Sequence, residues 1–181
     1  MPLEDDAGIY TVTARVLHWF TAIVVLAAIP IGIVMGRLGG GPTADFLYDL
    51  HRSLGALLIP LVALRLGWRF GHPPPPLPPD IPAVQRLAAH VSHWLLYVLL
   101  AVQPLVGWIA TSAYRAPITV FWLLPLPPIW PEDRAFSDRL FAVHKFIGVT
   151  LVVLICIHVA AALYHHFVRR DRVLMRMIVG A

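Results

Sequence analysis

The most regular feature of the chain is the alternation of long uncharged stretches with short charged ones. No Asp, Glu, Lys or Arg occurs within residues 16–36, 87–114 or 146–168, which are 21, 28 and 23 residues long. About 20 residues of apolar α-helix cross the hydrocarbon core of a bilayer. The pattern therefore predicts transmembrane helices in an integral membrane protein.

A fourth span, between the first two of these stretches, is less regular. Only 12 residues separate Arg52 from Arg65, so this segment crosses a membrane only if Arg65 faces the bundle interior or extends toward an interface. We include it because both neighbouring connections require it. The expected fold is all-α, an integral membrane four-helix bundle forming one domain over residues 1–181, with spans at about 16–36, 50–70, 89–113 and 140–168.

Proline is concentrated in the connections as well as in the spans. Pro30, Pro60 and Pro104 fall inside spans and should kink them. Residues 73–82 are mostly proline, which predicts an extended polyproline II strap across one membrane face. The third connection, at about 115–139, combines five prolines with aromatic residues and should form a loop at the headgroup level.

Composition agrees with a membrane protein and excludes other classes. Apolar residues make up 59% of the chain and charged residues 13%, against about 25% charged in soluble domains. The net charge of +4 does not indicate nucleic-acid binding, because the basic residues flank apolar spans. The single Cys156 should be a small buried side chain. No C-x-x-C-H motif is present, which excludes covalently attached c-type haem.

The orientation follows from the basic residues near the span ends. With four spans, both termini lie on one side of the membrane, and that side has eight basic residues against six. Four of the eight lie in the C-terminal tail, so both termini are expected to be cytoplasmic. Residues 1–6 are acidic where a signal peptide would be basic, so we expect no cleaved leader.

Nine histidines in so apolar a chain are the most informative anomaly. Ionisable groups inside a membrane are costly, and each is a functional candidate. His144 and His158 are 14 residues apart, close to four helical turns, so both project from one face with a rise of about 21 Å between them. His165 continues the same stripe one heptad later. The stripe predicts sites at two depths.

Antiparallel packing of the spans predicts a partner for each of these two histidines. His51 opens the second span at the depth of His144, and His18 opens the first span at the depth of His158. Two histidine pairs, one above the other, suit bis-histidine ligation of two stacked b-type haems. The predicted iron ligands are therefore His51 with His144 and His18 with His158.

Short motifs support this hypothesis. Residues 51–55 and 144–148 share the pattern His-basic-x-x-Gly. The glycine lies on the histidine's own face and would let a flat macrocycle approach the backbone, while the basic side chain would pair with a haem propionate. The further cofactor-binding residues predicted from these motifs are Arg52, Gly55, Lys145 and Gly148.

A two-helix repeat is also expected, and it leaves one ligand open. His18 precedes Gly32 by 14 residues, and His93 precedes Gly107 by 14. His93 is therefore a rival of His18 for the same ligand position, whereas Arg65 stands where the fourth span has His158. Three of the remaining histidines, His90, His165 and His166, are expected to line a polar pocket or interface. His72, beside the proline-rich segment, is expected to be solvated.

Taken together and in this order, these motifs resemble those of the bacterial cytochrome b561 family, and the resemblance covers essentially the whole chain. It implies a dihaem four-helix protein of the inner membrane, with His51 and His144 on the periplasmic haem and His18 and His158 on the cytoplasmic haem. It also implies quinone as a redox partner. The segments that carry the resemblance are 15–19, 51–55, 87–93, 144–148 and 158–166.

Three functions remain open at this point. One is electron transfer from a donor to membrane quinone, which the resemblance extends to superoxide oxidation coupled to ubiquinone reduction. A second is a cytochrome b subunit docked to a partner dehydrogenase or hydrogenase. A third, a haem-free metal transporter, is disfavoured by the near absence of intramembrane carboxylates. A quinone pocket or proton relay would use His90, His93, His165 and His166. Superoxide would be attracted by Arg52, Arg115, Arg134, Arg139 and Lys145.

Overall fold

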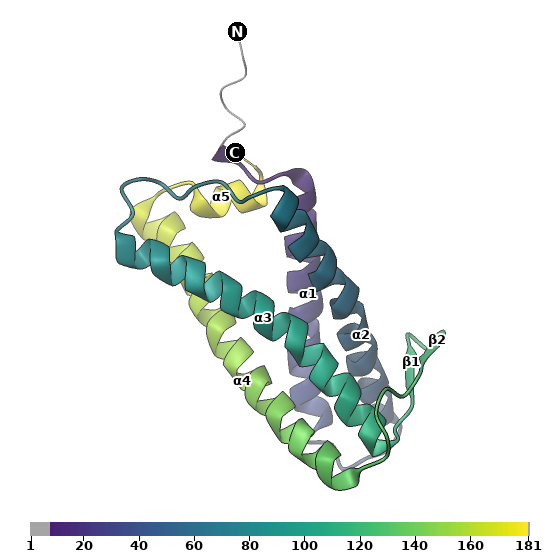
Figure 1. Cartoon of the computed structure of the whole chain (residues 1–181). Helices are drawn as coiled ribbons and strands as arrows, with labels where there is room; N and C mark the ends of the chain where they lie inside the picture. The colour runs from purple at the N-terminus through teal and green to yellow at the C-terminus, as the bar shows by residue number, and fades with distance from the viewer. Residues whose placement is uncertain (1–7, 181) are drawn as a thin grey trace.

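Four long helices run alternately up and down through the molecule (Figure 1). The computed structural model describes residues 8–180, so the acidic segment 1–6 lies outside the described residues. Each long helix is long and apolar enough to cross a membrane, which confirms the all-α membrane fold. The helices are α1 (Val12–Met35), α2 (Pro42–Gly71), α3 (Ala83–Tyr114) and α4 (Arg134–Tyr164).

Every helix begins several residues before the span predicted from the uncharged stretches. The difference arises because a helix continues through the polar zone of the membrane until a capping residue ends it. Thr11 accepts a hydrogen bond from the Ala14 amide at 3.2 Å, and Asp133 accepts one from the Phe136 amide at 2.9 Å. Both are side-chain caps of the ordinary kind. Pro42 occupies the first turn of α2, where its missing amide hydrogen costs nothing.

Both ends of the described chain lie at one end of the bundle, which we name the terminal end (Figure 1). There α4 continues into a π-helical turn, His165–Arg169, followed by the short helix α5, Val173–Ile178. This helix lies across the bundle end and is tied to α1, because the Trp19 indole donates to the Met177 carbonyl at 3.0 Å.

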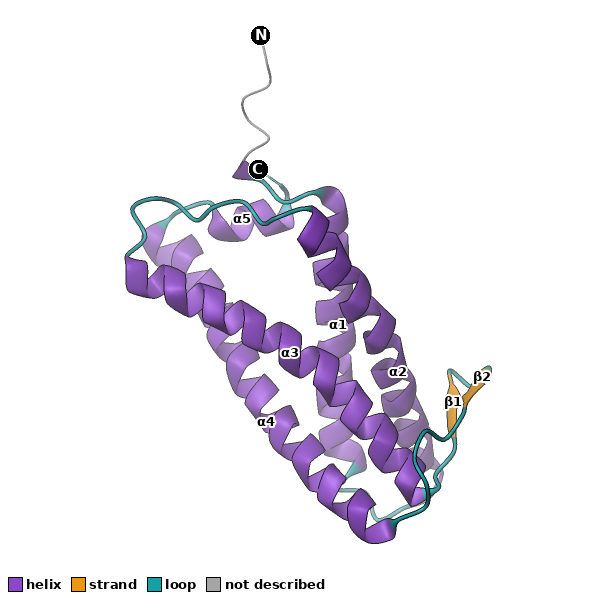
Figure 2. Cartoon of the chain, in the orientation of Figure 1, coloured by secondary structure: helices purple, strands orange, loops and turns teal. Residues whose placement is uncertain are grey.

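The opposite end, which we name the hairpin end, holds a two-stranded ribbon where the sequence predicted only a loop. β1 (Ile118–Val120) pairs antiparallel with β2 (Leu124–Leu126) (Figure 2). Phe121 and Trp122 turn the chain with positive φ angles of 47° and 59°. Glycine or asparagine is the usual signal for such a turn. Because Phe121 and Trp122 occupy these positions, the sequence did not indicate a turn.

The proline-rich strap crosses the terminal end from α2 to α3 (Figure 2). Residues 73–82 contain no helix or strand, and Ile81 is buried. Arg86 donates to the Ile81 carbonyl at 2.8 Å, and Arg176 donates to the Pro76 carbonyl at 2.9 Å. The strap therefore joins α2, α3 and α5 across one face of the bundle.

The apolar core lies between two levels of histidines. On each long helix the core residues lie between two of the residues that mark these levels. The bounding pairs are His18 and Gly32 on α1, His51 and Arg65 on α2, His93 and Gly107 on α3, and His144 and His158 on α4. Water is excluded from this middle layer because its side chains are aliphatic and packed together. The cluster consists of Val24, Val25, Leu58, Leu61, Val62, Leu100, Ile147 and Leu151.

Two sequence expectations concern side-chain direction. Arg65 is half-buried and its guanidinium meets the His18 ring at 2.7 Å, so it faces the bundle interior. Cys156, however, is exposed on the outside of α4, so the expectation that it is buried was wrong. A residue inside an apolar span need not face the protein, because lipid is as apolar a neighbour as the core.

Candidate functional site

At the hairpin end, the imidazoles of His51 and His144 face each other across the bundle. Their ring centroids are 6.0 Å apart and their planes cross at 83°. His51 Nδ1 lies 3.0 Å from the Ala28 carbonyl oxygen on α1, and His144 Nδ1 lies 3.1 Å from the Gln103 carbonyl oxygen on α3. Each imidazole is thus held by the helix that packs beside its own.

These carbonyl contacts determine which ring nitrogen carries the proton. A carbonyl oxygen only accepts hydrogen bonds, so Nδ1 of His51 and of His144 must be the donor. The lone pair of each ring is then on Nε2. A histidine ligand in which Nδ1–H donates to a backbone carbonyl, and Nε2 binds the metal, is a common arrangement. Both imidazoles therefore have an unprotonated Nε2, which is the form that a metal ligand requires.

Two glycines make room for these imidazoles. A Cβ atom on Gly32 would lie 2.8 Å from His51 Cε1, and one on Gly107 would lie 3.0 Å from His144 Cε1. A side chain at Gly32 would collide with the His51 ring, and one at Gly107 would require the His144 ring to move by a few tenths of an ångström. Both glycines follow a histidine by 14 residues in the sequence, which did not predict a role for them. That equal spacing was the available signal.

At the terminal end, three histidines and one arginine come from four different helices. The His18 and His158 ring centroids are 6.2 Å apart, and those of His93 and His158 are 5.4 Å apart. Arg65 Nη2 lies 2.7 Å from His18 Nδ1. The structure thus brings the predicted pair together and places the rival His93 against the same partner.

Ring separation tests whether the pairs suit a metal ion. A first-row metal ion lies about 2 Å from an imidazole nitrogen, and the ring centre lies roughly 1 Å beyond it, so two coaxial ligands have centroids about 6 Å apart. The His51–His144 and His18–His158 separations of 6.0 and 6.2 Å match this value. The 5.4 Å between His93 and His158 is shorter. Both pairs therefore have the ring separation that a shared metal ion would need.

The two helix pairs, α1–α2 and α3–α4, form an internal repeat. On α1 and α3, a histidine, a residue whose carbonyl accepts a hydrogen bond from the neighbouring helix, and a glycine recur at the same intervals: His18, Ala28 and Gly32 correspond to His93, Gln103 and Gly107. On α2 and α4, the hairpin-end histidines correspond, but α2 has Arg65 where α4 has His158. The repeat therefore yields one symmetric site and one asymmetric site.

The other predicted cofactor-binding residues lie beside the hairpin-end pair. Arg52 donates to the Asp49 carboxylate at 3.2 Å and to the Pro117 carbonyl at 3.3 Å. Lys145 is exposed. A Cβ atom on Gly55 would meet no atom within 4 Å, whereas one on Gly148 would lie 3.4 Å from the Gln103 amide nitrogen. Their role in holding a macrocycle stays a prediction.

The remaining histidines have other neighbours. His165 Nδ1 lies 2.6 Å from the Asp171 carboxylate, within the tail that follows α4. Burial alone would raise the pKa of the Asp171 carboxyl, but hydrogen bonds from His165, the Val173 amide and Arg169 hold it below its usual value. His90 is exposed and His166 is half-buried. These contacts tie the tail together, and a role in proton transfer stays a prediction.

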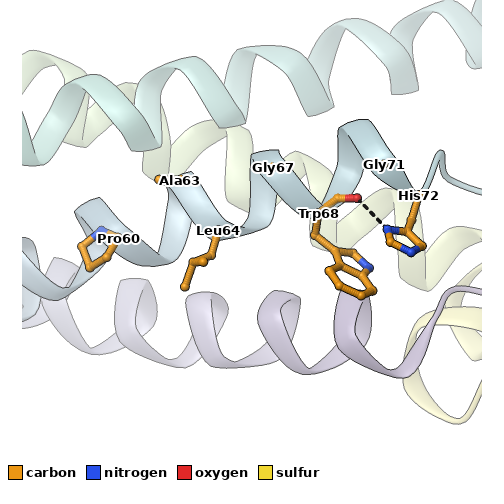
Figure 3. A pocket seen from close by; sticks show the side chains of 7 residues that line it. All are labelled: Pro60, Ala63, Leu64, Gly67, Trp68, Gly71 and His72. Carbon is orange, nitrogen blue, oxygen red and sulfur yellow. Dashed lines mark hydrogen bonds between the residues drawn. The ribbon is translucent and has the colours of Figure 1, made fainter.

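A hollow of about 590 Å³ lies along α2, and the paired histidines are not among its lining residues (Figure 3). His72 stacks on Trp68 with 3.9 Å between ring centroids, and its Nδ1 donates to the Trp68 carbonyl at 3.2 Å. His72 is exposed there, as expected. The lining residues are Pro60, Ala63, Leu64, Gly67, Trp68, Gly71 and His72.

Comparison with known proteins agrees with this geometry. A family model described as prokaryotic cytochrome b561 matches residues 9–180. Cytochrome b561 homolog 2 of Escherichia coli is 34% identical over 173 residues, which cover 93% of this chain and 90% of that protein. Probable superoxide oxidase CybB of Yersinia pestis is 27% identical over 162 residues, which cover 90% and 91%. Cytochrome b561 homolog 1 of Escherichia coli is 27% identical over 170 residues, which cover 93% and 96%.

Proposed function

The chain belongs to the prokaryotic cytochrome b561 family of haem b membrane electron-transfer proteins, and from that premise we propose that it carries two haems. His51 and His144 hold one at the hairpin end, and His18 and His158 hold the other at the terminal end. The protein passes electrons from a donor at one membrane face to a quinone in the bilayer.

One observation carries this proposal. Two imidazole pairs lie at two depths, each with the ring separation that a shared metal ion would require. The histidines of α4 are separated by about 21 Å along the helix axis, which is less than the thickness of the hydrocarbon core. Together the two sites therefore extend across most of the membrane.

The protein's residues contribute ligation, orientation and burial. Bound haem supplies one-electron chemistry at its iron. The Ala28 and Gln103 carbonyls keep Nε2 of His51 and His144 free of a proton and hold the ring planes. The aliphatic layer between the two levels excludes water, which lowers the local dielectric and strengthens the effect of nearby charges on the potential.

The first test is a reduced-minus-oxidised visible spectrum of the detergent-purified protein, with haem quantified per chain. We expect two low-spin b haems per polypeptide. A single haem would mean that one of the proposed pairs is wrong. Absence of haem after expression with adequate haem supply would contradict the proposal.

Superoxide is the donor that the comparisons favour, because one relative is named as a probable superoxide oxidase. Two superoxide anions each lose one electron and become oxygen, and one quinone takes both electrons and two protons to become a quinol. The anion would be attracted to the basic residues of the hairpin end. Glu132 weakens this field, because it lies 3.8 Å from both Arg115 and Arg134.

Stopped-flow mixing of the oxidised protein with superoxide tests this assignment. We expect rapid haem reduction, slowed by added salt because the attraction is electrostatic. A salt-independent rate would count against steering. No reduction by superoxide, together with co-purification of a dehydrogenase or hydrogenase, would favour the docked-subunit alternative. Residence in the bacterial inner membrane, with cytoplasmic termini, would place this hairpin end in the periplasm.

A further inference from the structure

The terminal end contains two arginines on the inner side of α2, one helical turn apart. Arg65 and Arg69 are both half-buried. Their guanidinium carbons lie 5.0 and 5.5 Å from the centroid of the Tyr97 ring on α3, and Arg69 lies 5.4 Å from the Trp94 ring centroid. Tyr97 is itself buried. The two cations therefore converge on one aromatic surface at the depth of the terminal-end histidines.

Neither cation has a carboxylate partner within residues 8–180. All the arginine ion pairs in that range are made by arginines elsewhere, two at the hairpin end, one on α2 near its start and one in the tail. Charged side chains inside a membrane-spanning bundle are normally paired, because transferring an unpaired cation from water is costly. Contacts with aromatic rings compensate only in part. A bound anion would supply the missing negative charge.

Tyr10 adds a neutral hydrogen-bond donor beside these cations. Burial raises the pKa of the Tyr10 phenol above its ordinary value, although the positive charges of Arg69, Arg176 and Arg65 act to lower it. The phenol therefore keeps its proton at neutral pH. Guanidinium groups together with a protonated phenol are donors that suit a carboxylate.

The contact between Arg65 and His18 points to the same ligand. Arg65 is always a donor, so His18 Nδ1 accepts and the ring proton lies on Nε2. This is the opposite of the arrangement in His51 and His144, where the proton lies on Nδ1. In His18 the proton is on Nε2, the nitrogen that would bind iron. Ligation by His18 through Nε2 therefore requires Arg65 to exchange Nδ1 for another acceptor.

We propose that Arg65 and Arg69 bind the propionate carboxylates of the terminal-end haem. This inference rests on the two-haem function proposed above. A haem ligated by His18 and His158 would itself bring its propionates to this depth. Binding of a propionate by Arg65 would free His18 Nδ1 from its contact with the guanidinium. The hairpin end differs, because its half-buried Arg52 already pairs with Asp49.

Redox-induced infrared difference spectroscopy of the holoprotein tests the proposal directly. The protein is prepared with haem labelled with carbon-13 at the propionate carboxyls, in phosphatidylcholine nanodiscs that contain no anionic lipid. Wild type is compared with Arg65→Gln, Arg69→Gln and the control Arg86→Gln, whose exposed side chain binds only strap carbonyls. We expect label-sensitive carboxylate bands to shift in the first two variants and to stay unchanged in the control.

The midpoint potentials provide a second readout. Removing a guanidinium beside one haem favours its ferric form, and we expect at least a tenfold change in the equilibrium constant, about 59 mV for one electron, at that haem only. If Arg65→Gln fails to retain the haem, Arg65→Lys keeps the charge but loses the two-pronged geometry. Shifted label-sensitive bands in that variant would support the proposal.

The outcomes separate this inference from the function on which it rests. Two haems in the wild type with unchanged label-sensitive bands in both arginine variants would overturn propionate binding and leave the two-haem function standing. If, in addition, added phosphatidylglycerol changes the spectrum of the wild type but not those of the two arginine variants, the anion is a lipid phosphate. That result would also overturn propionate binding. A wild-type protein without two haems would overturn both proposals.

Discussion

The two ends of the bundle hold their histidines by different means. At the hairpin end, His51 and His144 each rest against a backbone carbonyl and a glycine of the neighbouring helix, and these contacting groups are uncharged. At the terminal end, the ring of His18 contacts a guanidinium, and His93 provides a third imidazole against His158. The histidine contacts are therefore symmetric and uncharged at one end, and asymmetric with a guanidinium at the other.

This difference shows how one substitution makes the two ends unlike. The repeat alone would relate α1–α2 to α3–α4 and make each end symmetric, but at the terminal end Arg65 on α2 replaces the counterpart of His158 on α4. A permanent positive charge near a haem favours the ferrous form, because reduction removes one positive charge from the iron. We therefore expect the terminal-end haem to have the higher potential, so that electrons move from the hairpin end to the terminal end.

Removing a ligand should have the largest effect. His144→Ala should abolish the hairpin-end haem and keep the terminal-end haem, so that haem per chain is roughly halved, because one axial ligand is lost. His158→Ala should do the reverse. Haem quantification and low-temperature spectra of the two variants check this, with the exposed His90→Ala as the control. Loss of the same spectral component in both variants would contradict two separate sites.

The choice between His18 and His93 sharpens the comparison at the terminal end. His18→Ala should lose the terminal-end haem, whereas His93→Ala should retain it, because only the His18–His158 separation of 6.2 Å matches that of the other pair. Electron paramagnetic resonance of the ferric protein reports the axial ligands of each haem. If His93→Ala loses the haem and His18→Ala keeps it, the ligand assignment is reversed.

Glycine substitutions probe the neutral end on a smaller scale. Gly107→Ala places a Cβ 3.0 Å from His144 Cε1, so the ring must shift. We expect a changed spectrum and weaker retention of the hairpin-end haem only, at a cost on the order of 1–3 kcal/mol. Gly67→Ala is the matched control, because a Cβ there meets no atom within 4 Å. Equal spectra for Gly107→Ala and wild type would argue against this role of the glycine.

Acid should loosen the terminal end before the hairpin end. The pKa of Asp171 is held below its usual value, so its contribution to stability is present above about pH 4 and is lost as the pH falls further. Asp171→Asn should lower the thermal midpoint at pH 7, by an amount corresponding to about 1 kcal/mol, and the difference from wild type should shrink as the pH falls below about 4. The exposed Asp138→Asn is the control. A pH-independent difference would show that Asp171 does not act through its charge.

Sequence periodicity was sufficient to predict most of the fold. Uncharged stretches identified three spans directly, and topology required the fourth, because crossing a bilayer demands a fixed length of apolar helix. The helix starts were misplaced by several residues, since caps such as Asp133 lie outside the apolar part. The β1–β2 ribbon was missed because Phe121 and Trp122 carry no local signal for their positive φ angles.

The candidate site was predictable to the level of depth. Helical rise places His144 and His158 at two levels, and antiparallel order places His51 and His18 opposite them. The hydrogen-bond partners of the imidazoles were not predictable, because every residue has a backbone carbonyl. The side chains of Ala28 and Gln103 do not indicate that their carbonyls accept from a histidine. Tyr97, buried beneath two arginines, was missed for the same reason.

The amino-acid sequence by itself determined that this protein crosses a membrane with four helices and has histidines at two depths. These properties depend only on hydrophobicity and on the rise and rotation per residue along a single helix. The tertiary structure decided which imidazoles face each other, which glycines admit them and that Arg65 contacts His18. Those facts depend on the rotation and register of each helix against its neighbours, which are set by packing across the whole bundle.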